Sequence, residues 1–141
     1  LEKIISFENQ DCASMTFPNK TFDAAIASFG VRNFADIDTS FEEIVRVLNP
    51  GGVFMFIELT TPTIQPFKFF YNVYSNSFIP FITRLLSKDK RAYDYLPASI
   101  KAFPQGEEML GILKKSGFET VDKSTLTLGV CTIYVAKKAT V

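Results

Sequence analysis

The sequence predicts an α/β fold in which parallel strands are followed by an antiparallel hairpin near the C-terminal end. Two observations lead to this fold class. A strand, helix, strand pattern over residues 22–59 forms a βαβ unit, and the two strands of such a unit are nearly always parallel. Two β-favouring runs within 118–137 are separated by only about four residues, which is too few for a crossover helix, so they pair antiparallel.

The first part of the chain contains two candidate strands. Residues 4–7 form a short β-favouring run, which we expect to be a strand. A turn follows at residues 17–20, where Pro18 and Asn19 each restrict the backbone. Residues 22–29 are mostly apolar, and a short run of this kind is typical of a strand that is buried on both faces of a sheet.

The helix of the βαβ unit is predicted to begin within residues 36–40. Thr39 and Ser40 each stand three residues before a glutamate, which leaves two registers of a capping box open. The helix ends in the turn 49–52, and the nearly continuous apolar run 53–59 forms the next strand. Apolar residues recur at helical spacing and predict one core-facing side; they are Ile37, Phe41, Ile44, Val45 and Leu48.

Aromatic residues are concentrated in residues 67–87. Polar residues and a proline interrupt this stretch, so it is too short and too broken to span a bilayer. Two interpretations stay open: the aromatics fill the core of a helical pair, or some of them line an apolar pocket for a hydrophobic ligand. We interpret 63–104 as a helical insertion within one domain of residues 1–141, with the charged run 88–91 on a solvated surface.

The last third of the chain predicts a helix and a hairpin. Residues 107–115 form the helix, with lysines in its last turn, where positive charge is favourable, and Gly117 as its stop. The runs 118–123 and 128–137 form the hairpin, joined by residues 124–127.

The composition excludes several kinds of chemistry. The chain has no histidine, which removes Ser-His-Asp and Cys-His nucleophiles and histidine-bearing zinc sites. Basic and acidic residues number 15 each, so the formal net charge is zero and we expect no nucleic-acid partner. Cys12 and Cys131 cannot form a four-cysteine site, and we expect no metal. Any chemistry that this chain performs must therefore use carboxylates, tyrosines, arginine, backbone groups or a cofactor.

Five segments together resemble the ubiquinone/menaquinone biosynthesis C-methyltransferase family, which is a class I S-adenosylmethionine-dependent family. Residues 17–23 and 46–52 are shared by many class I methyltransferases. Residues 28–33, Ser-Phe-Gly-Val-Arg-Asn, are close to the family's own G-[LV]-R-N signature. Residues 93–100 resemble its Y-x-Y-L-x-x-S-I segment, and residues 119–129 resemble part of its closing hairpin.

The resemblance implies that the chain is the C-terminal part of such an enzyme and is inactive alone. The family's glycine-rich turn and its ribose-binding acidic residue have no counterpart here. The fold is then a partial, Rossmann-like class I sheet whose first two strands are missing, with residues 3–8 as the third strand. Residues 22–29 become an open edge, so we expect residues 3–8 to re-pair locally or two copies to associate as a homodimer. A complete protein that has lost half of a cofactor site is the alternative.

By resemblance, the reaction transfers a methyl group from S-adenosylmethionine to a ring carbon of a prenylated hydroquinone, which is demethylmenaquinol or the ubiquinol precursor. The candidate catalytic residues are Arg32, Asn33 and Glu58, at the ends of two adjacent strands. Arg32 orients a water or stabilises a phenolate, Asn33 binds a ring oxygen, and Glu58 is a base or a substrate contact. Loop-pinning roles stay open for the first two.

The resemblance also assigns binding residues. Asp11 and Cys12 match positions that contact the adenine of S-adenosylmethionine, and Ser28 with Phe29 match the next part of the cofactor site. Purely structural roles stay open: a turn for Asp11, and packing under a helix for Ser28. The substrate-pocket candidates are Phe70, Tyr74, Tyr93 and Tyr95, and packing is an open alternative for the last two.

The expected substrate also suggests where the protein acts. Residues 64–86 would accept the prenyl tail and touch the membrane in which the substrate dissolves. We expect a cytoplasmic protein with peripheral contact to the inner face of the membrane. Two other interpretations stay open: a different small-molecule S-adenosylmethionine methyltransferase, and a non-catalytic half-domain that dimerises.

Overall fold

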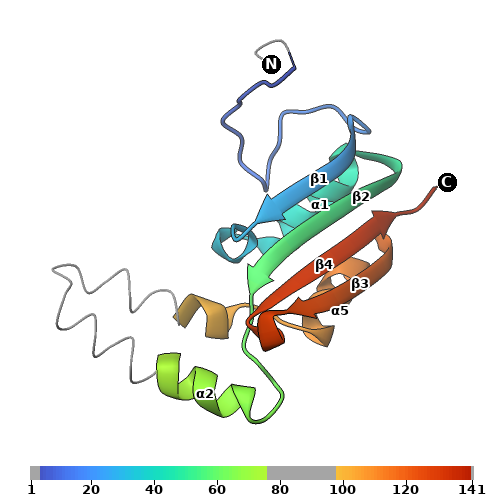
Figure 1. Ribbon diagram of the computed structural model, residues 1–141. Coiled ribbons are helices and arrows are strands. Elements are labelled where there is room, and N and C mark those ends of the chain that lie inside the picture. Colours follow the sequence, from blue (N-terminus) through green and yellow to red (C-terminus); the bar gives the residue numbers. More distant parts are fainter. Residues whose placement is uncertain (1–3, 76–97, 141) are drawn as a thin grey trace, which may run out of the picture.

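The computed structural model describes residues 4–75 and 98–140, which form a four-stranded mixed sheet in the order β1-β2-β4-β3 (Figure 1). The strands are β1 (Phe22–Ser28), β2 (Leu48–Leu59), β3 (Phe118–Leu126) and β4 (Cys131–Lys138). β1 pairs parallel with β2, whereas the β2–β4 and β3–β4 pairs are antiparallel. The predicted α/β class, with parallel strands followed by an antiparallel hairpin, is confirmed.

One face of the sheet carries the hydrophobic core. Helices α1 (Ile37–Val47) and α5 (Glu107–Lys115) pack on this face (Figure 1). Phe54 and Phe56 point to it from β2, and their rings lie 5.6 and 5.8 Å from the ring of Phe41 on α1. Because strand side chains alternate, Met55 lies on the other face, where 38% of it is exposed. The two helices therefore cover one face of the sheet.

Strand β1 is less buried than its apolar sequence predicted. No residue of β1 is fully buried, and 73% of Ile26 is exposed. Within the described residues, β1 pairs only with β2 and so forms an edge of the sheet. The prediction of burial on both faces is wrong because burial depends on neighbours that the pattern of one strand does not specify.

The predicted strand at residues 4–7 is also wrong. Residues 5–10 have no regular structure, and 94% of Phe7 is exposed. A strand needs a neighbour with which to exchange backbone hydrogen bonds, and no described strand lies beside this segment. Residues 4–8 therefore do not re-pair locally. The chain becomes anchored only further on, where the Arg46 guanidinium donates hydrogen bonds to the carbonyls of Met15 and Phe17.

Helix α1 begins at a different cap from the two predicted. Asp36 is the N-cap, and its carboxylate accepts hydrogen bonds from the backbone N–H and the hydroxyl of Thr39. Neither capping-box register at Thr39 or Ser40 is used, because both residues already lie inside the helix. The predicted core-facing side is correct, and Phe41 and Ile44 are buried.

The other boundaries differ by a few residues from the prediction. β2 starts at Leu48, directly after α1, because Leu48 already pairs with Phe22. Helix α5 has the predicted bounds. β3 continues to Leu126, and the hairpin turn is the 3-10 element η3 (Thr127–Gly129).

Only part of the aromatic segment is described. Helix α2 (Phe67–Val73) lies beyond the carboxyl end of β2 (Figure 1), and residues 98–102 are helical. The remainder of the predicted helical segment and the charged run 88–91 lie outside the described residues.

We expect the 141-residue chain to self-associate through the outer edge of β1, because an unpaired strand edge forms hydrogen bonds with a second strand. Ile26→Lys places a charge on the exposed face of this edge strand and should shift the equilibrium towards the monomer. Sedimentation velocity over a range of concentrations measures this shift. Phe69→Lys, on exposed helix α2, is the matched control. A chain that stays monomeric at every concentration would contradict the expectation.

Candidate functional site

The carboxyl ends of β1 and β2 meet at one edge of the sheet because the two strands are parallel. The 3-10 element η1 (Val31–Asn33) follows β1 at this edge. Phe29, between them, donates its backbone N–H to the carbonyl of Ile57 at 2.9 Å. Ligands of open α/β sheets bind at the carboxyl ends of the strands, so this edge is the place to search for a site.

Arg32 and Glu58 form a buried ion pair at this edge. The Arg32 Nη1 donates to the Glu58 Oε1, and the Arg32 backbone N–H donates to the Oε2 at 3.2 Å. The Glu58 side chain is fully buried, and that of Arg32 is 13% exposed. Glu58 also accepts the backbone N–H of Leu59 at 3.0 Å. The carboxylate therefore holds both the side chain and the backbone of Arg32.

The same guanidinium fixes an unusual backbone conformation. Phe29 has a φ of 53°, in the left-handed region that non-glycine residues rarely adopt. The Arg32 Nη1 donates to the Phe29 carbonyl at 3.0 Å. The buried Nε of Arg32 has no hydrogen-bond partner among the described residues. Strain of this kind persists only where surrounding contacts hold it, and it is common at functional sites.

Asn33 completes this turn. Its backbone N–H donates to the carbonyl of Gly30 at 3.0 Å. The structure thus brings four predicted residues to one edge with Asn33: Ser28, Phe29, Arg32 and Glu58.

The predicted adenine contacts lie in a separate turn. The Asp11 Oδ1 accepts the backbone N–H of Ala13 at 2.9 Å, and the Asp11 carbonyl accepts that of Ser14 at 3.0 Å. Burial raises the pKa of the Cys12 thiol, and the Asp11 carboxylate raises it further. The thiol is therefore neutral near neutral pH.

Ser28 lines a mostly apolar cavity of about 230 Å³ on the sheet face opposite the core helices. Its other lining residues come from β1, β2 and β4: Ile26, Ala27, Met55, Phe56, Ile57 and Ile133.

A second apolar cavity, of about 290 Å³, holds two of the predicted pocket residues. Phe70 and Tyr74 line it from the helical segment, opposite Leu128 of the hairpin turn. The remaining lining residues are Pro62, Phe67, Tyr71, Thr127 and Val130. Tyr93 and Tyr95 lie outside the described residues.

Sequence reasoning missed Tyr71 and Cys131. Burial raises the pKa of the Tyr71 hydroxyl, a hydrogen bond to Ser75 lowers it, and Cys131 raises it. Burial and then the Glu58 carboxylate raise the pKa of the Cys131 thiol. Tyr71 lines the same cavity as Val130, the residue before Cys131, and Cys131 pairs with Leu59, the residue after Glu58. The sequence could have indicated Tyr71 only through its place next to Phe70. Nothing local could have indicated Cys131, because the antiparallel pairing of β4 with β2 brings it to this edge.

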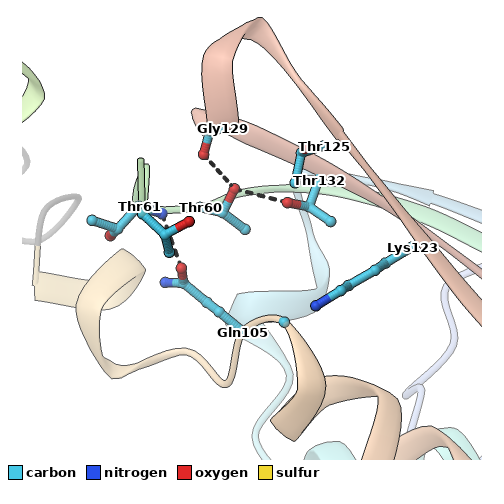
Figure 2. A pocket seen from close by; sticks show the side chains of 9 residues that line it. Thr60, Thr61, Gln105, Lys123, Thr125, Gly129 and Thr132 are labelled. Carbon is cyan, nitrogen blue, oxygen red and sulfur yellow. Dashed lines mark hydrogen bonds between the residues drawn. The ribbon is translucent and has the colours of Figure 1, made fainter. Parts of the chain in front are cut away.

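A third pocket, of about 170 Å³, is lined by several threonines together with Gln105 and Lys123 (Figure 2). The Thr60 hydroxyl donates to the Gly129 carbonyl and bonds to the Thr132 hydroxyl, both at 2.9 Å. The Thr61 backbone N–H donates to the Gln105 Oε1 at 2.9 Å. These bonds tie the residues after β2 to the hairpin and to Gln105, and they hold the lining of this pocket in place.

In residues 4–75 and 98–140, no three histidine, cysteine or acidic residues gather as a metal site would require. No helix in these ranges is long and apolar enough to cross a membrane.

Comparison with known sequences gives a consistent family. The model of the ubiE/COQ5 methyltransferase family matches residues 2–138. A demethylmenaquinone methyltransferase of Bacteroides fragilis is 47% identical over 98% of this chain and 56% of its own length. That of Porphyromonas gingivalis is 41% identical with the same coverage. The ubiquinone/menaquinone biosynthesis C-methyltransferase UbiE of Klebsiella pneumoniae is 33% identical over 92% of this chain and 52% of its length. The chain thus spans about half the length of these relatives.

Solved structures share the fold at low identity. The [4+2]-cyclase SpnF has a TM-score of 0.63 at 18% identity and covers 94% of this chain and 55% of its own. A phosphoethanolamine N-methyltransferase of Haemonchus contortus, in complex with S-adenosyl-L-methionine, has a TM-score of 0.61 at 12% identity, covering 92% of this chain and 36% of its own. The fold is therefore that of class I methyltransferases, and at these identities it carries no statement about substrate.

We predict that Arg32→Ala lowers the free energy of unfolding by about 3–5 kcal/mol, because it leaves the buried Glu58 carboxylate without its cation. Adding Glu58→Leu should recover part of this loss. Recovery stays incomplete because Glu58 also accepts two backbone N–H groups. Urea denaturation measures both effects.

Glu107→Gln is the matched control for this prediction, since it removes the carboxylate of an exposed pair with Lys123. Its urea midpoint should stay close to that of the unsubstituted chain. Equal midpoints for Arg32→Ala and Glu107→Gln would show that the buried pair contributes no more to stability than the exposed pair does.

Proposed function

The chain belongs to the ubiE/COQ5 methyltransferase family, and from this premise we propose that the protein, as its gene encodes it, methylates a ring carbon of a prenylated hydroquinone. S-adenosylmethionine is the methyl donor. Demethylmenaquinol is the first substrate to test, because the relatives with 47% and 41% identity are named demethylmenaquinone methyltransferases. The observation that carries the proposal is the buried arginine–glutamate pair at the carboxyl ends of β1 and β2, in a chain that also has an apolar cavity between helix α2 and the hairpin turn.

The residues present fit part of S-adenosylmethionine. Ser28 lines a cavity, and the left-handed Phe29 turns the backbone at the carboxyl end of β1. Asp11 offers a carboxylate for the adenine amino group, although one of its oxygens already accepts the Ala13 N–H. We propose that these residues and Cys12 hold the adenosine part. The cofactor, when bound, supplies a methyl group that is activated by a positively charged sulfur.

The protein's part in the reaction is to align the ring and to favour its ionised form. A ring carbon becomes nucleophilic when the neighbouring hydroxyl loses its proton. We propose that the Arg32 guanidinium, whose side chain is 13% exposed, stabilises the phenolate oxygen, and that Asn33 binds a ring oxygen. The low exposure of Arg32 strengthens this interaction, because little water screens its charge.

The prenyl tail is proposed to lie in the cavity between helix α2 and the hairpin turn. Phe70, Tyr74 and Leu128 line this cavity and are themselves more than half exposed. An apolar surface of this kind favours contact with a lipid interface. We therefore propose a cytoplasmic protein with peripheral contact to the inner face of the membrane. We propose that residues 63–104 are a tail-binding insertion, of which Tyr93 and Tyr95 lie outside the described residues.

The double variant Phe70→Ala, Tyr74→Ala should raise the KM for a long-chain prenylated quinol by about tenfold, since apolar burial stabilises the bound tail. It should leave the KM for a short-chain analogue nearly unchanged. Mass spectrometry of the methylated product gives both values. Val73→Ala, on the same helix but outside the cavity, is the control.

Two results would count against the proposal. If no prenylated quinol is methylated, the protein either methylates a different small molecule or has no catalytic role. If the double variant raises both KM values equally, the cavity does not bind the tail.

A further inference from the structure

We infer that Glu58 is a positioning residue that acts through Arg32 and takes no proton from the substrate. The inference rests on the proposed function, because it concerns the same reaction. Sequence reasoning left Glu58 open as a base or a substrate contact. The geometry around its carboxylate decides between these roles and a third one.

The carboxylate of Glu58 is closed off from any ligand. Its Oε1 accepts the Arg32 Nη1 and the Leu59 backbone N–H, and its Oε2 accepts the Arg32 backbone N–H. The residue has 0% exposure. A general base must reach the proton that it removes directly or through one water. A carboxylate with three protein donors and no exposed surface does not meet this condition.

The same contacts make Glu58 the link that shapes the loop. It binds Arg32 at two points, on the guanidinium and on the backbone. The guanidinium in turn holds the carbonyl of Phe29, whose own N–H is bonded to Ile57 beside Glu58. These bonds close a ring from the end of β1 to the end of β2. They fix both the direction of Arg32 and the left-handed backbone at Phe29.

The chemistry of this ring requires a full-length, charged carboxylate. Glutamine has nearly the same shape, but its amide nitrogen is a donor and would face the donors of Arg32 or of the backbone. Aspartate keeps the charge but is one methylene shorter, so it cannot hold the backbone and the guanidinium in the same positions. Both changes should therefore disturb Arg32, although only one of them removes the charge.

The test is a double-mutant cycle on methyl transfer by the protein as its gene encodes it, with Glu58→Gln, Arg32→Lys and the pair. A misplacement of about 1 Å lowers kcat by about 100-fold, so we expect a loss of this order in each single variant. Because Glu58 acts through Arg32, the double variant should be little worse than either single one. Losses that multiply would overturn the inference.

The pH profile separates positioning from acid–base chemistry. Glu58→Gln should lower kcat at every pH and keep the acidic limb of the wild-type profile. Loss of that limb in Glu58→Gln, with retention in Glu58→Asp, would make Glu58 the base and overturn the inference. If Glu58→Gln does not fold, the cycle with Glu58→Asp and Arg32→Lys gives the same decision. Glu42→Gln, an exposed carboxylate on α1, is the control.

A readout without substrate distinguishes failure of this inference from failure of the proposed function. The guanidinium signals of Arg32, assigned by ¹⁵N NMR, should show restricted Nη rotation in the wild type. This restriction should be lost in Glu58→Gln and kept in Glu42→Gln. An unrestricted Arg32 in the wild type would overturn the inference, whatever the assays show. A restricted Arg32 without methylation of any quinol would leave the positioning role intact and contradict the proposed function.

Discussion

The structure at the carboxyl ends of β1 and β2 depends on the ion pair between Arg32 and Glu58. Backbone hydrogen bonds join β1 and β2 along their length, but they do not determine the path of the backbone after Ser28. The ion pair determines that path, because it ties η1 to the last residues of β2 and holds Phe29 in a strained conformation. A buried ion pair adds little net stability, since desolvation offsets its attraction. Its value here is a single defined orientation for one guanidinium.

The topology of the sheet determines which other groups meet this pair. The parallel order of β1 and β2 brings their carboxyl ends to the same edge, and the antiparallel order of β4 brings its first residues there as well. Cys131, the first residue of β4, is thereby close enough to Glu58 for the carboxylate to raise the pKa of the thiol. Helix α2 then adds Tyr71 to the same neighbourhood. Residues from three distant parts of the sequence thus share one edge.

Helices and turns that depend on nearby residues could be predicted from the sequence, whereas contacts between distant segments could not. Helix α5 was predicted with the correct bounds because its charges, apolar spacing and following glycine all lie within a few residues. The exposure of β1 and the absence of a strand at residues 4–7 depend on what lies beside them, which no local pattern encodes. Their places after two adjacent strands led to Arg32 and Glu58 as candidates but not to their contact. The position of Cys131 opposite Leu59 follows from the pairing of β4 with β2, and that of Tyr71 from the packing of α2 near the hairpin turn.

The edge combines two environments that one substrate of mixed character would need. The cavity of Phe70, Tyr74 and Leu128 is apolar and partly open, which suits a flexible hydrocarbon chain. The ion pair at the carboxyl ends of β1 and β2 is buried, and water screens its field weakly there. Burial by itself makes an aromatic hydroxyl harder to ionise. The hydroxyl therefore loses its proton more readily than in water only if the attraction of the guanidinium for the phenolate exceeds the cost of burying that anion. Glu58 already neutralises much of that guanidinium, so in the function proposed here the orientation of Arg32 towards the ring oxygen matters together with its weakly screened charge.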